Sequence, residues 1–152
     1  MSIEIANRCP ATRPDRAALA RIIRGVLRME GRSGGDITLV LGRDVLLREL
    51  NHRFRHIGRT TDVLSFEPQA GVDADDSMPG EIYVSMDRVV VQARRYRHTA
   101  HRELARLVIH GTLHVLGHDH HREPWRSRMR KRERECQQAL VPADVSLFSL
   151  KS

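Results

Sequence analysis

The chain has 152 residues and a mass of 17.4 kDa, which suits one domain with a hydrophobic core of its own. No apolar run reaches the roughly 18–20 residues that a membrane helix needs, and residues 1–15 lack the apolar stretch of a secretory signal. Two cysteines, Cys9 and Cys136, are too few for a disulfide framework and indicate free thiols in a cytoplasmic protein.

The net charge of +7 is concentrated in one third of the chain. Residues 88–134 carry 12 arginines and Lys131 against four acids, a net charge of +9, whereas the segments on either side carry −1 each. Such a basic region indicates either a polyanionic partner, most often nucleic acid, or a charged surface that only keeps the protein in solution. The charge alone does not decide between the two.

In chain order, the first half predicts two strands, each followed by a helix. Residues 3–7 alternate as in a strand, and Pro14 and Asp15 begin a helix that ends at Gly31. The apolar stripe of this helix is Leu19, Ile22, Ile23, Val26 and Leu27. Residues 37–41 predict a second strand, after which Asp44 begins a second helix. Its apolar residues are Leu46, Leu47, Leu50 and Phe54.

The second half predicts strands at 62–66 and 81–85, joined by a polar loop at 67–80. A third helix begins with the apolar residues Met86, Val89, Val90 and Ala93. Thr99 caps a fourth helix, which ends at Gly117. Its buried stripe is Leu104, Leu107, Val108, Gly111 and Val115.

A last helix begins at Pro124, with the apolar residues Trp125, Met129, Cys136 and Leu140. The whole chain, residues 1–152, therefore predicts a single α+β domain, with about four strands in a mixed sheet and about five helices.

Five of the nine histidines lie within residues 110–121. His110 and His114 are four residues apart on a predicted helix, so both rings can reach one metal ion at about 2.0–2.1 Å. Gly117 permits the left-handed turn that brings His120 back toward the same ion. The alternative is a histidine-rich helix end that only stabilises its own C-terminus, and the spacing favours the metal site.

Three neutral imidazoles and an open position are typical of a catalytic zinc site, although imidazole also suits other transition metals. Asp119 either orients a ligand ring or serves as a turn residue. The spacing overlaps that of a zinc peptidase motif, but Gly111 stands where the peptidase has its glutamate base. The pattern therefore indicates chemistry other than peptide cleavage.

Three sequence blocks resemble the YbeY family of bacterial endoribonucleases: LNHRFRHIGRTTDVLSF at 50–66, PGEIYVS at 79–85 and HGTLHVLGHDH at 110–120. The resemblance implies a metal-dependent hydrolase that acts in ribosomal RNA maturation and ribosome quality control. It also implies a zincin-like mixed sheet, with a zinc ion held at a helix end by His110, His114 and His120.

The resemblance also suggests residues around the cleft. Arg55 matches an arginine beside the cleft that is suited to binding phosphate; the alternative is a helix-end arginine that bonds carbonyls or an acid, and the phosphate role is favoured. Asp62 and Ser65 either shape the cleft or cap and turn the strand. Glu81 stands where the family usually has aspartate, which keeps a carboxylate but moves it by one methylene.

The sequence therefore predicts a zinc-dependent endoribonuclease specific for single strands, with Arg55 and His114 as catalytic residues. Its partners would be single-stranded RNA, ribosomal RNA and the small ribosomal subunit, without a membrane. The arginines expected to follow the RNA backbone without reading bases are Arg126, Arg128, Arg130 and Arg132. The alternative is a non-catalytic RNA-binding assembly factor in which the metal is structural.

Overall fold

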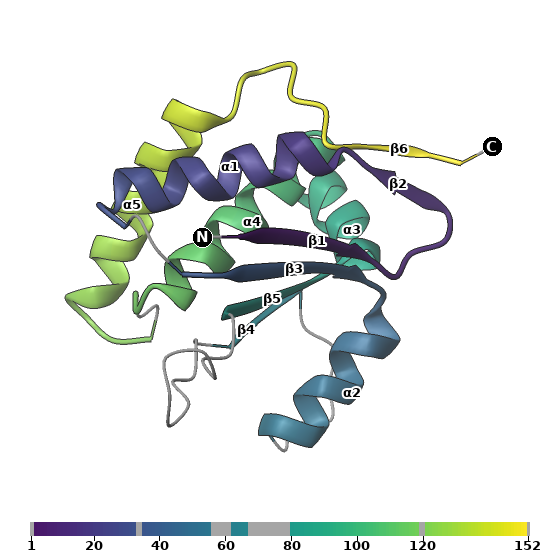
Figure 1. Cartoon of the computed structure of the whole chain (residues 1–152), viewed down its shortest axis with the longest axis horizontal. Helices are drawn as coiled ribbons and strands as arrows, with labels where there is room; N and C mark the ends of the chain where they lie inside the picture. Colours follow the sequence, from purple (N-terminus) through teal and green to yellow (C-terminus); the bar gives the residue numbers. More distant parts are fainter. Residues whose placement is uncertain (1, 33–34, 56–61, 67–79, 119–120, 152) are drawn as a thin grey trace.

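A computed structural model describes residues 2–32, 35–55, 62–66, 80–118 and 121–151 (Figure 1). The helices are α1 (Arg16–Met29), α2 (Asp44–Arg55), α3 (Met86–Tyr96), α4 (Ala100–Val115) and α5 (Trp125–Leu140). The strands are β1 (Ile3–Asn7), β2 (Thr12–Pro14), β3 (Ile37–Gly42), β4 (Val63–Phe66), β5 (Gly80–Ser85) and β6 (Phe148–Leu150). None of the described helices is long and apolar enough to cross a membrane.

Four strands form one mixed sheet in the order β1-β3-β5-β4. β1, β3 and β5 are parallel, and β4 pairs with β5 in the antiparallel direction at the edge. Parallel neighbours need a crossover connection, which α1 supplies between β1 and β3. The predicted α+β fold with four strands in a mixed sheet and five helices is therefore confirmed for the described residues.

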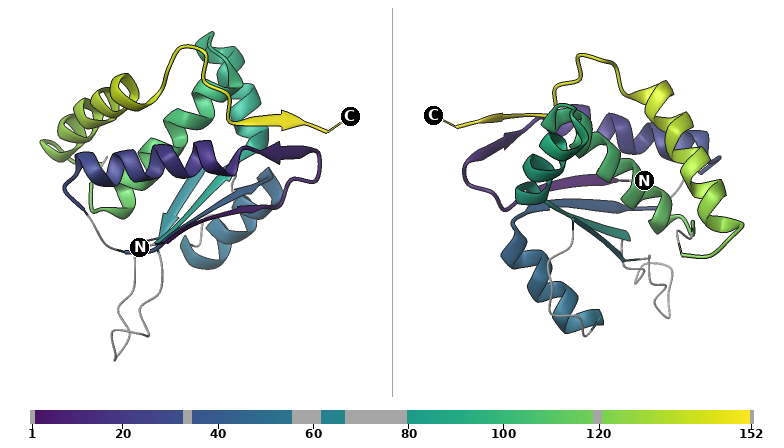
Figure 2. Two further views of the ribbon diagram at one scale, coloured as in Figure 1. Left: turned by 45° about the horizontal axis from the view of Figure 1, so that its top comes forward. Right: turned by 180° about the vertical axis from the view of Figure 1, so that it is seen from behind.

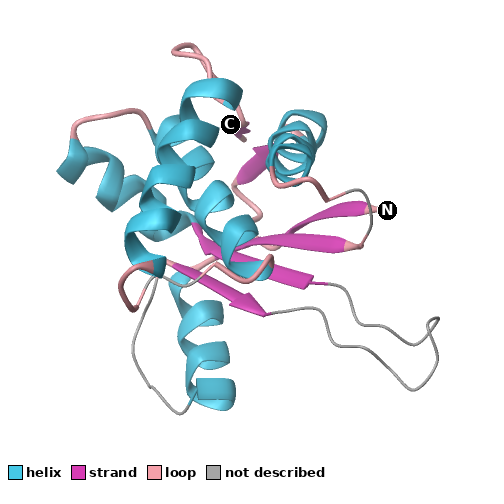
Figure 3. Ribbon diagram, turned by 90° about the vertical axis from the view of Figure 1, so that its left-hand side faces the viewer, coloured by secondary structure: helices cyan, strands magenta, loops and turns pink. Residues whose placement is uncertain are grey.

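Helices lie on both faces of the sheet (Figures 2 and 3). α1 and α4 cover one face and α5 packs against both of them, while α2 lies on the other side. The main core fills the space between the sheet and the two helices α1 and α4. Every residue of the apolar stripes predicted for these two helices is buried. Burying these aliphatic side chains is the main favourable contribution to folding.

Side chains cap the N-termini of α4 and α1. The hydroxyl of Thr99 accepts a hydrogen bond from the amide of Arg102 at 3.1 Å, which confirms the predicted cap of α4. The carboxylate of Asp15 accepts one from the amide of Ala18 at 3.0 Å at the start of α1. Each cap satisfies a backbone donor that has no partner within the helix.

Other features differ from the prediction. β2 and β6 form an antiparallel pair of three residues each, too short to show an alternating pattern, and they come from opposite ends of the chain. Three residues predicted on the apolar sides of helices are exposed, because the tertiary structure leaves that part of each helix uncovered. These are Phe54, Val90 and Trp125. The predicted loop at 67–80 lies outside the described residues up to Gly80, which begins β5.

Both cysteines are buried free thiols, as predicted. Cys9 follows β1, and Cys136 lies on the buried side of α5. Burial raises the pKa of each thiol above its usual value, because the thiolate would lose its hydration.

α4 approaches the sheet closely at Gly111. A Cβ atom on this residue would lie 2.6 Å from Cγ2 of Ile82 and 3.2 Å from Oγ of Ser65. Ile82 is fully buried on β5, and its β-branched side chain has little room to rotate away. The sequence therefore has glycine here for packing, and a glutamate at this position would not fit.

We expect Gly111→Ala to lower the free energy of unfolding by about 1–2 kcal/mol. The methyl group overpacks the contact with Ile82, and this cost exceeds the gain in helix propensity. Urea denaturation measures the change, with Arg102→Ala on the exposed side of α4 as the control. An unfolding midpoint equal to or above that of the wild type would show that the contact tolerates a side chain.

Candidate metal centre

Two of the three predicted metal ligands lie on successive turns of α4. The ring centroids of His110 and His114 are 6.4 Å apart, and the ring planes are inclined by 35°. Their four-residue spacing places them on one face of the helix. Both side chains are half-buried, so the two rings are partly shielded from water but still accessible to a small ligand.

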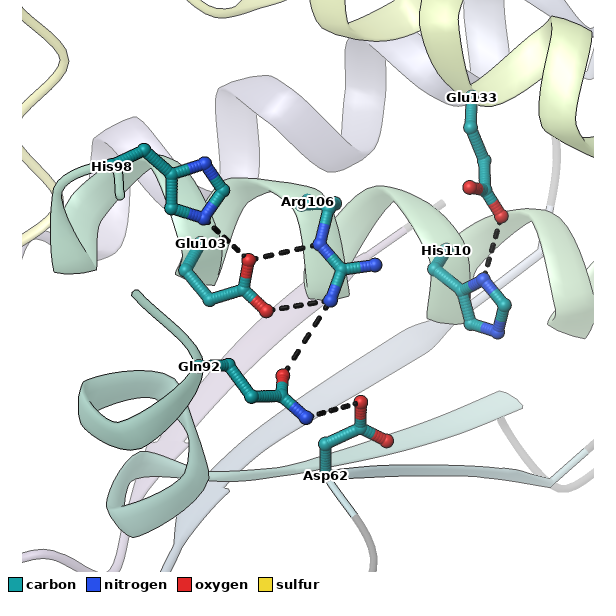
Figure 4. Close-up of polar contacts among 7 residues, drawn as sticks. All are labelled: Asp62, Gln92, His98, Glu103, Arg106, His110 and Glu133. Carbon is teal, nitrogen blue, oxygen red and sulfur yellow. Dashed lines mark hydrogen bonds and ion pairs between the residues drawn. The ribbon is translucent and has the colours of Figure 1, made fainter. Parts of the chain in front are cut away.

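Glu133 on α5 lies directly behind His110 (Figure 4). Nδ1 of His110 is 2.6 Å from Oε1 of Glu133, and each side chain is 21% exposed. An ionised carboxylate only accepts hydrogen bonds, so Nδ1 carries the proton in this contact, which leaves the lone pair of a neutral ring on Nε2. A carboxylate in this position orients a histidine and increases its basicity as a metal ligand.

Reasoning from the sequence missed Glu133. It lies 23 residues after His110, and only the packing of α5 against α4 brings the two together. One signal was present: Glu133 is one of only four acids in the strongly basic segment 88–134. An acidic side chain among so many arginines suggests that it has a specific partner.

The chain turns after α4 as the glycine predicts. Gly117 has a φ of +100°, and its amide donates to the carbonyl of His114 at 3.0 Å. The amide of His118 donates to the carbonyl of Leu113 at 3.1 Å, which completes a helix end of the type that glycine favours.

His120 and Asp119 follow this turn but lie outside the described residues. Within the described ranges, no three histidine, cysteine or acidic side chains are grouped closely enough to hold a metal ion. The third ligand and the zincin-like site therefore stay predictions.

His118 contacts Glu30, which lies just after the end of α1. Glu30 also accepts a hydrogen bond from Nε of Arg132 on α5 at 2.7 Å. Burial acts to raise the pKa of Glu30, but the hydrogen bonds from Arg132 and His118 outweigh it and lower that pKa. Arg132 also donates to the carbonyl of Met29 and to Glu135. Arg132 is predicted to contact RNA, but its guanidinium holds α5 against the end of α1.

A further carboxylate, Glu103 on α4, is fully buried and is held by an arginine and a histidine (Figure 4). Arg106 donates to it from Nε at 2.9 Å and from Nη2 at 2.6 Å, and His98 lies 2.7 Å away. The hydrogen bond to Glu103 raises the pKa of Arg106 above its usual value. Such a carboxylate is tolerated in the interior only because these groups replace its hydration.

The contacts continue from Arg106 to the strand edge. Arg106 reaches the side-chain oxygen of Gln92 at 3.5 Å, and the amide nitrogen of Gln92 donates to Asp62 at 3.1 Å. The backbone carbonyl of Asp62 also accepts from the amide of Ser85 at 2.9 Å. Asp62 thus links the start of β4 to α3 and β5, in agreement with the alternative that it caps and turns the strand.

Ser65 is buried where β4 meets α4. Its hydroxyl donates to the carbonyl of Gly111 at 3.2 Å, one residue after His110. This contact gives Ser65 a structural role next to the candidate ligands. A direct part in the cleft stays a prediction.

Glu81 lies on the other face of the sheet. Side chains alternate between faces along a strand, and Ile82, the next residue, points at Gly111 of α4. The carboxylate of Glu81 accepts a hydrogen bond from the hydroxyl of Tyr83 at 2.7 Å. Burial and this bond raise the pKa of Tyr83 to about 12. The structure therefore does not bring Glu81 to the histidines.

Arg55 is the last residue of α2, and its side chain is not among the parts of the chain that the structure describes.

The remaining predicted RNA contacts lie on the exposed side of α5. Nε of Arg126 donates to Glu123 at 2.9 Å, an exposed pair that contributes little to stability. The guanidinium of Arg128 lies over the ring of Trp125, 4.8 Å from its centroid. Arg130 is exposed as well. These three cations thus face solvent, in contrast to Arg132.

Comparisons with known proteins agree with the three sequence blocks. A family model described as "Endoribonuclease YbeY" matches residues 4–141. A curated protein of that name from Roseiflexus sp. strain RS-1 is 38% identical over 139 residues, covering 83% of this chain and 84% of its own. Another, from Clostridium botulinum strain Eklund 17B, is 34% identical over 142 residues, covering 80% and 86%.

A solved structure shares the fold. The solution structure of TM1509 from Thermotoga maritima has a TM-score of 0.58 and 25% identity to this chain. The match covers 95% of this chain and 96% of that one. The architecture of a four-stranded mixed sheet and five helices is therefore similar to one observed experimentally.

We expect Arg106→Ala to destabilise the fold by about 2–4 kcal/mol, because the buried carboxylate of Glu103 keeps only His98 as a partner. Arg106→Lys should recover part of this loss, since it restores the charge without the two-pronged contact. Chemical denaturation compares these variants with Arg102→Ala, an exposed neighbour whose loss should change stability by less than about 0.5 kcal/mol. Equal effects at the two arginines would contradict the assigned role.

Proposed function

The chain belongs to the YbeY family of endoribonucleases, and we propose that it is a zinc-dependent enzyme that cleaves single-stranded ribosomal RNA. The cleavage would serve ribosomal RNA maturation and ribosome quality control in the cytoplasm, with the small ribosomal subunit as partner. The observation that carries the proposal is the pair His110 and His114 on one face of α4, with Glu133 hydrogen-bonded to the first ring.

The donor chemistry at this end of α4 fits a zinc ion. Imidazole nitrogens are ligands that zinc prefers, and a carboxylate behind one ring is a common companion of a ligating histidine. His110, His114 and His120 would hold the ion. When bound, zinc supplies Lewis-acid polarisation of a phosphoryl oxygen and a water molecule of lowered pKa.

The chain's own groups would bind and orient the RNA. Arg55 would contact a phosphate at the cleaved position, where a guanidinium neutralises negative charge that develops on phosphoryl oxygens. The exposed cations Arg126, Arg128 and Arg130 on α5 would attract the rest of the backbone. A peptide substrate is disfavoured, since Gly111 leaves no space for a glutamate base.

The central test is His114→Ala in the full chain. We expect this variant to lose both bound zinc and cleavage of single-stranded ribosomal RNA, because one of three ligands is gone. Elemental analysis measures the metal and gel electrophoresis measures the RNA fragments. His52→Ala, an exposed histidine on α2, should keep both.

The opposite outcomes are distinct. Cleavage at the wild-type rate by a zinc-free His114→Ala protein would contradict the proposed function. A closed site of four protein ligands, together with unfolding on chelation, would instead support the non-catalytic assembly factor with a structural metal.

The carboxylate of Glu133 is expected to orient His110 toward the metal. Glu133→Gln should weaken zinc binding by about 10- to 100-fold while the fold is kept, because the neutral amide no longer increases the basicity of His110. Competition with a chromogenic chelator measures the affinity. Glu135→Gln, on the same helix and paired with Arg132, is the control. Equal zinc affinities for the two variants would show that Glu133 does not support zinc binding.

A further inference from the structure

The only tryptophan of the chain is half exposed, although the sequence places it on the apolar side of its helix. Trp125 is the first residue of α5, and 50% of its surface is accessible. The helix buries Met129 and Cys136 instead. A large aromatic ring left in water beside buried positions marks a surface that has something to bind.

An arginine accompanies this ring. Arg128, three residues later on the same helix, places its guanidinium carbon 4.8 Å from the centroid of Trp125. The flat cation lies over one face of the indole, a favourable cation–π arrangement. Both side chains are exposed, so the pair presents an aromatic ring and a positive charge at one place on the surface.

The pair borders a hollow of about 560 Å³ between the end of α4 and the start of α5. Among the described residues, its other lining residues are Leu116, Gly117 and His118. The volume lies within the range of small-ligand sites, about 300–1,000 Å³. Gly117 belongs to the turn that directly follows the helix carrying His110 and His114.

We propose that this hollow holds one nucleotide of a single-stranded RNA, with its base stacked on Trp125 and its phosphate at Arg128. The proposal rests on the proposed function for the choice of RNA. An aromatic ring next to a flat cation suits a base and its phosphate, and the exposed Arg122, Arg126 and Arg130 make the surroundings positive.

This subsite accounts for strand selectivity without base selectivity. In a duplex, each base is already stacked between its neighbours, so its face is not available to the indole. A single strand offers that face, and every base has one, so stacking on Trp125 discriminates strand state rather than sequence. The subsite therefore adds to the backbone contacts a direct means of recognising unpaired RNA.

The single tryptophan makes the proposal directly measurable. The full wild-type chain is titrated with a 2′-O-methyl hexa-adenylate and with an abasic hexamer of the same charge, and indole emission is recorded. We expect strong quenching by the first and little by the second, because only the first has bases to stack on Trp125. Equal quenching would show that charge alone binds here and would overturn the proposal.

Variants test the same point through the anisotropy of a labelled hexa-adenylate. Trp125→Ala should weaken binding by about tenfold, and Trp125→Phe by less, since a smaller ring still stacks. The matched control is Tyr96→Ala, another exposed aromatic with an arginine over its ring, that of Arg106 at 5.6 Å. It lies on α3 and should leave the affinity unchanged.

The cation is tested in the same way. Arg128→Ala should weaken binding and reduce its salt dependence by more than Arg95→Ala, which removes an exposed arginine from α3. Wild-type affinity in Trp125→Ala, or an equal loss in Tyr96→Ala, would overturn the subsite. If the wild type cleaves RNA in such a case, only the subsite fails. If the wild type neither binds nor cleaves RNA, the proposed function fails together with the subsite.

Discussion

The close contact of α4 with the edge of the sheet is the constraint on which the candidate site depends. Gly111 lets the helix backbone approach Ile82 so closely that a Cβ atom at this position would force a shift, and it also brings the backbone near Ser65. Because a helix turns about 100° per residue, His110 and His114 then lie on the flank of the helix rather than against the sheet. That flank is where α5 packs and where Glu133 meets His110.

Two buried or half-buried carboxylates hold the elements around this contact in place. Glu103 ties the start of α4 to Arg106 and, through Gln92, to Asp62 at the beginning of β4. Glu30 joins the end of α1 to α5 and to the turn after α4. Polar groups in the interior are costly unless they are fully hydrogen-bonded, so each of these clusters favours one arrangement of the helices around the histidines.

The last helix combines two roles. It turns Glu133 and the buried Met129 toward the rest of the fold, and it presents exposed arginines to solvent, with Trp125 exposed at its first turn. The groups that orient a metal ligand and those proposed to hold RNA are therefore parts of one rigid element. For an enzyme of this family, this arrangement would keep the bound strand and the proposed reacting centre in a constant relation to each other. The segment 88–134, in which the positive charge is concentrated, contains all of α4 and most of α5.

By itself, the sequence determined what depends on neighbours along the chain. The helices and the four main strands, the cap at Thr99, the turn at Gly117 and the pairing of His110 with His114 follow from periodicity and from the chemistry of single residues. The tertiary structure alone decided the partner of His110, the placement of Glu81 on the far face and the pairing of β2 with β6. It also decided that one arginine of α5 is used within the fold and that its tryptophan is exposed. These features depend on which surfaces cover one another, and residues far apart in sequence meet only once the helices have packed.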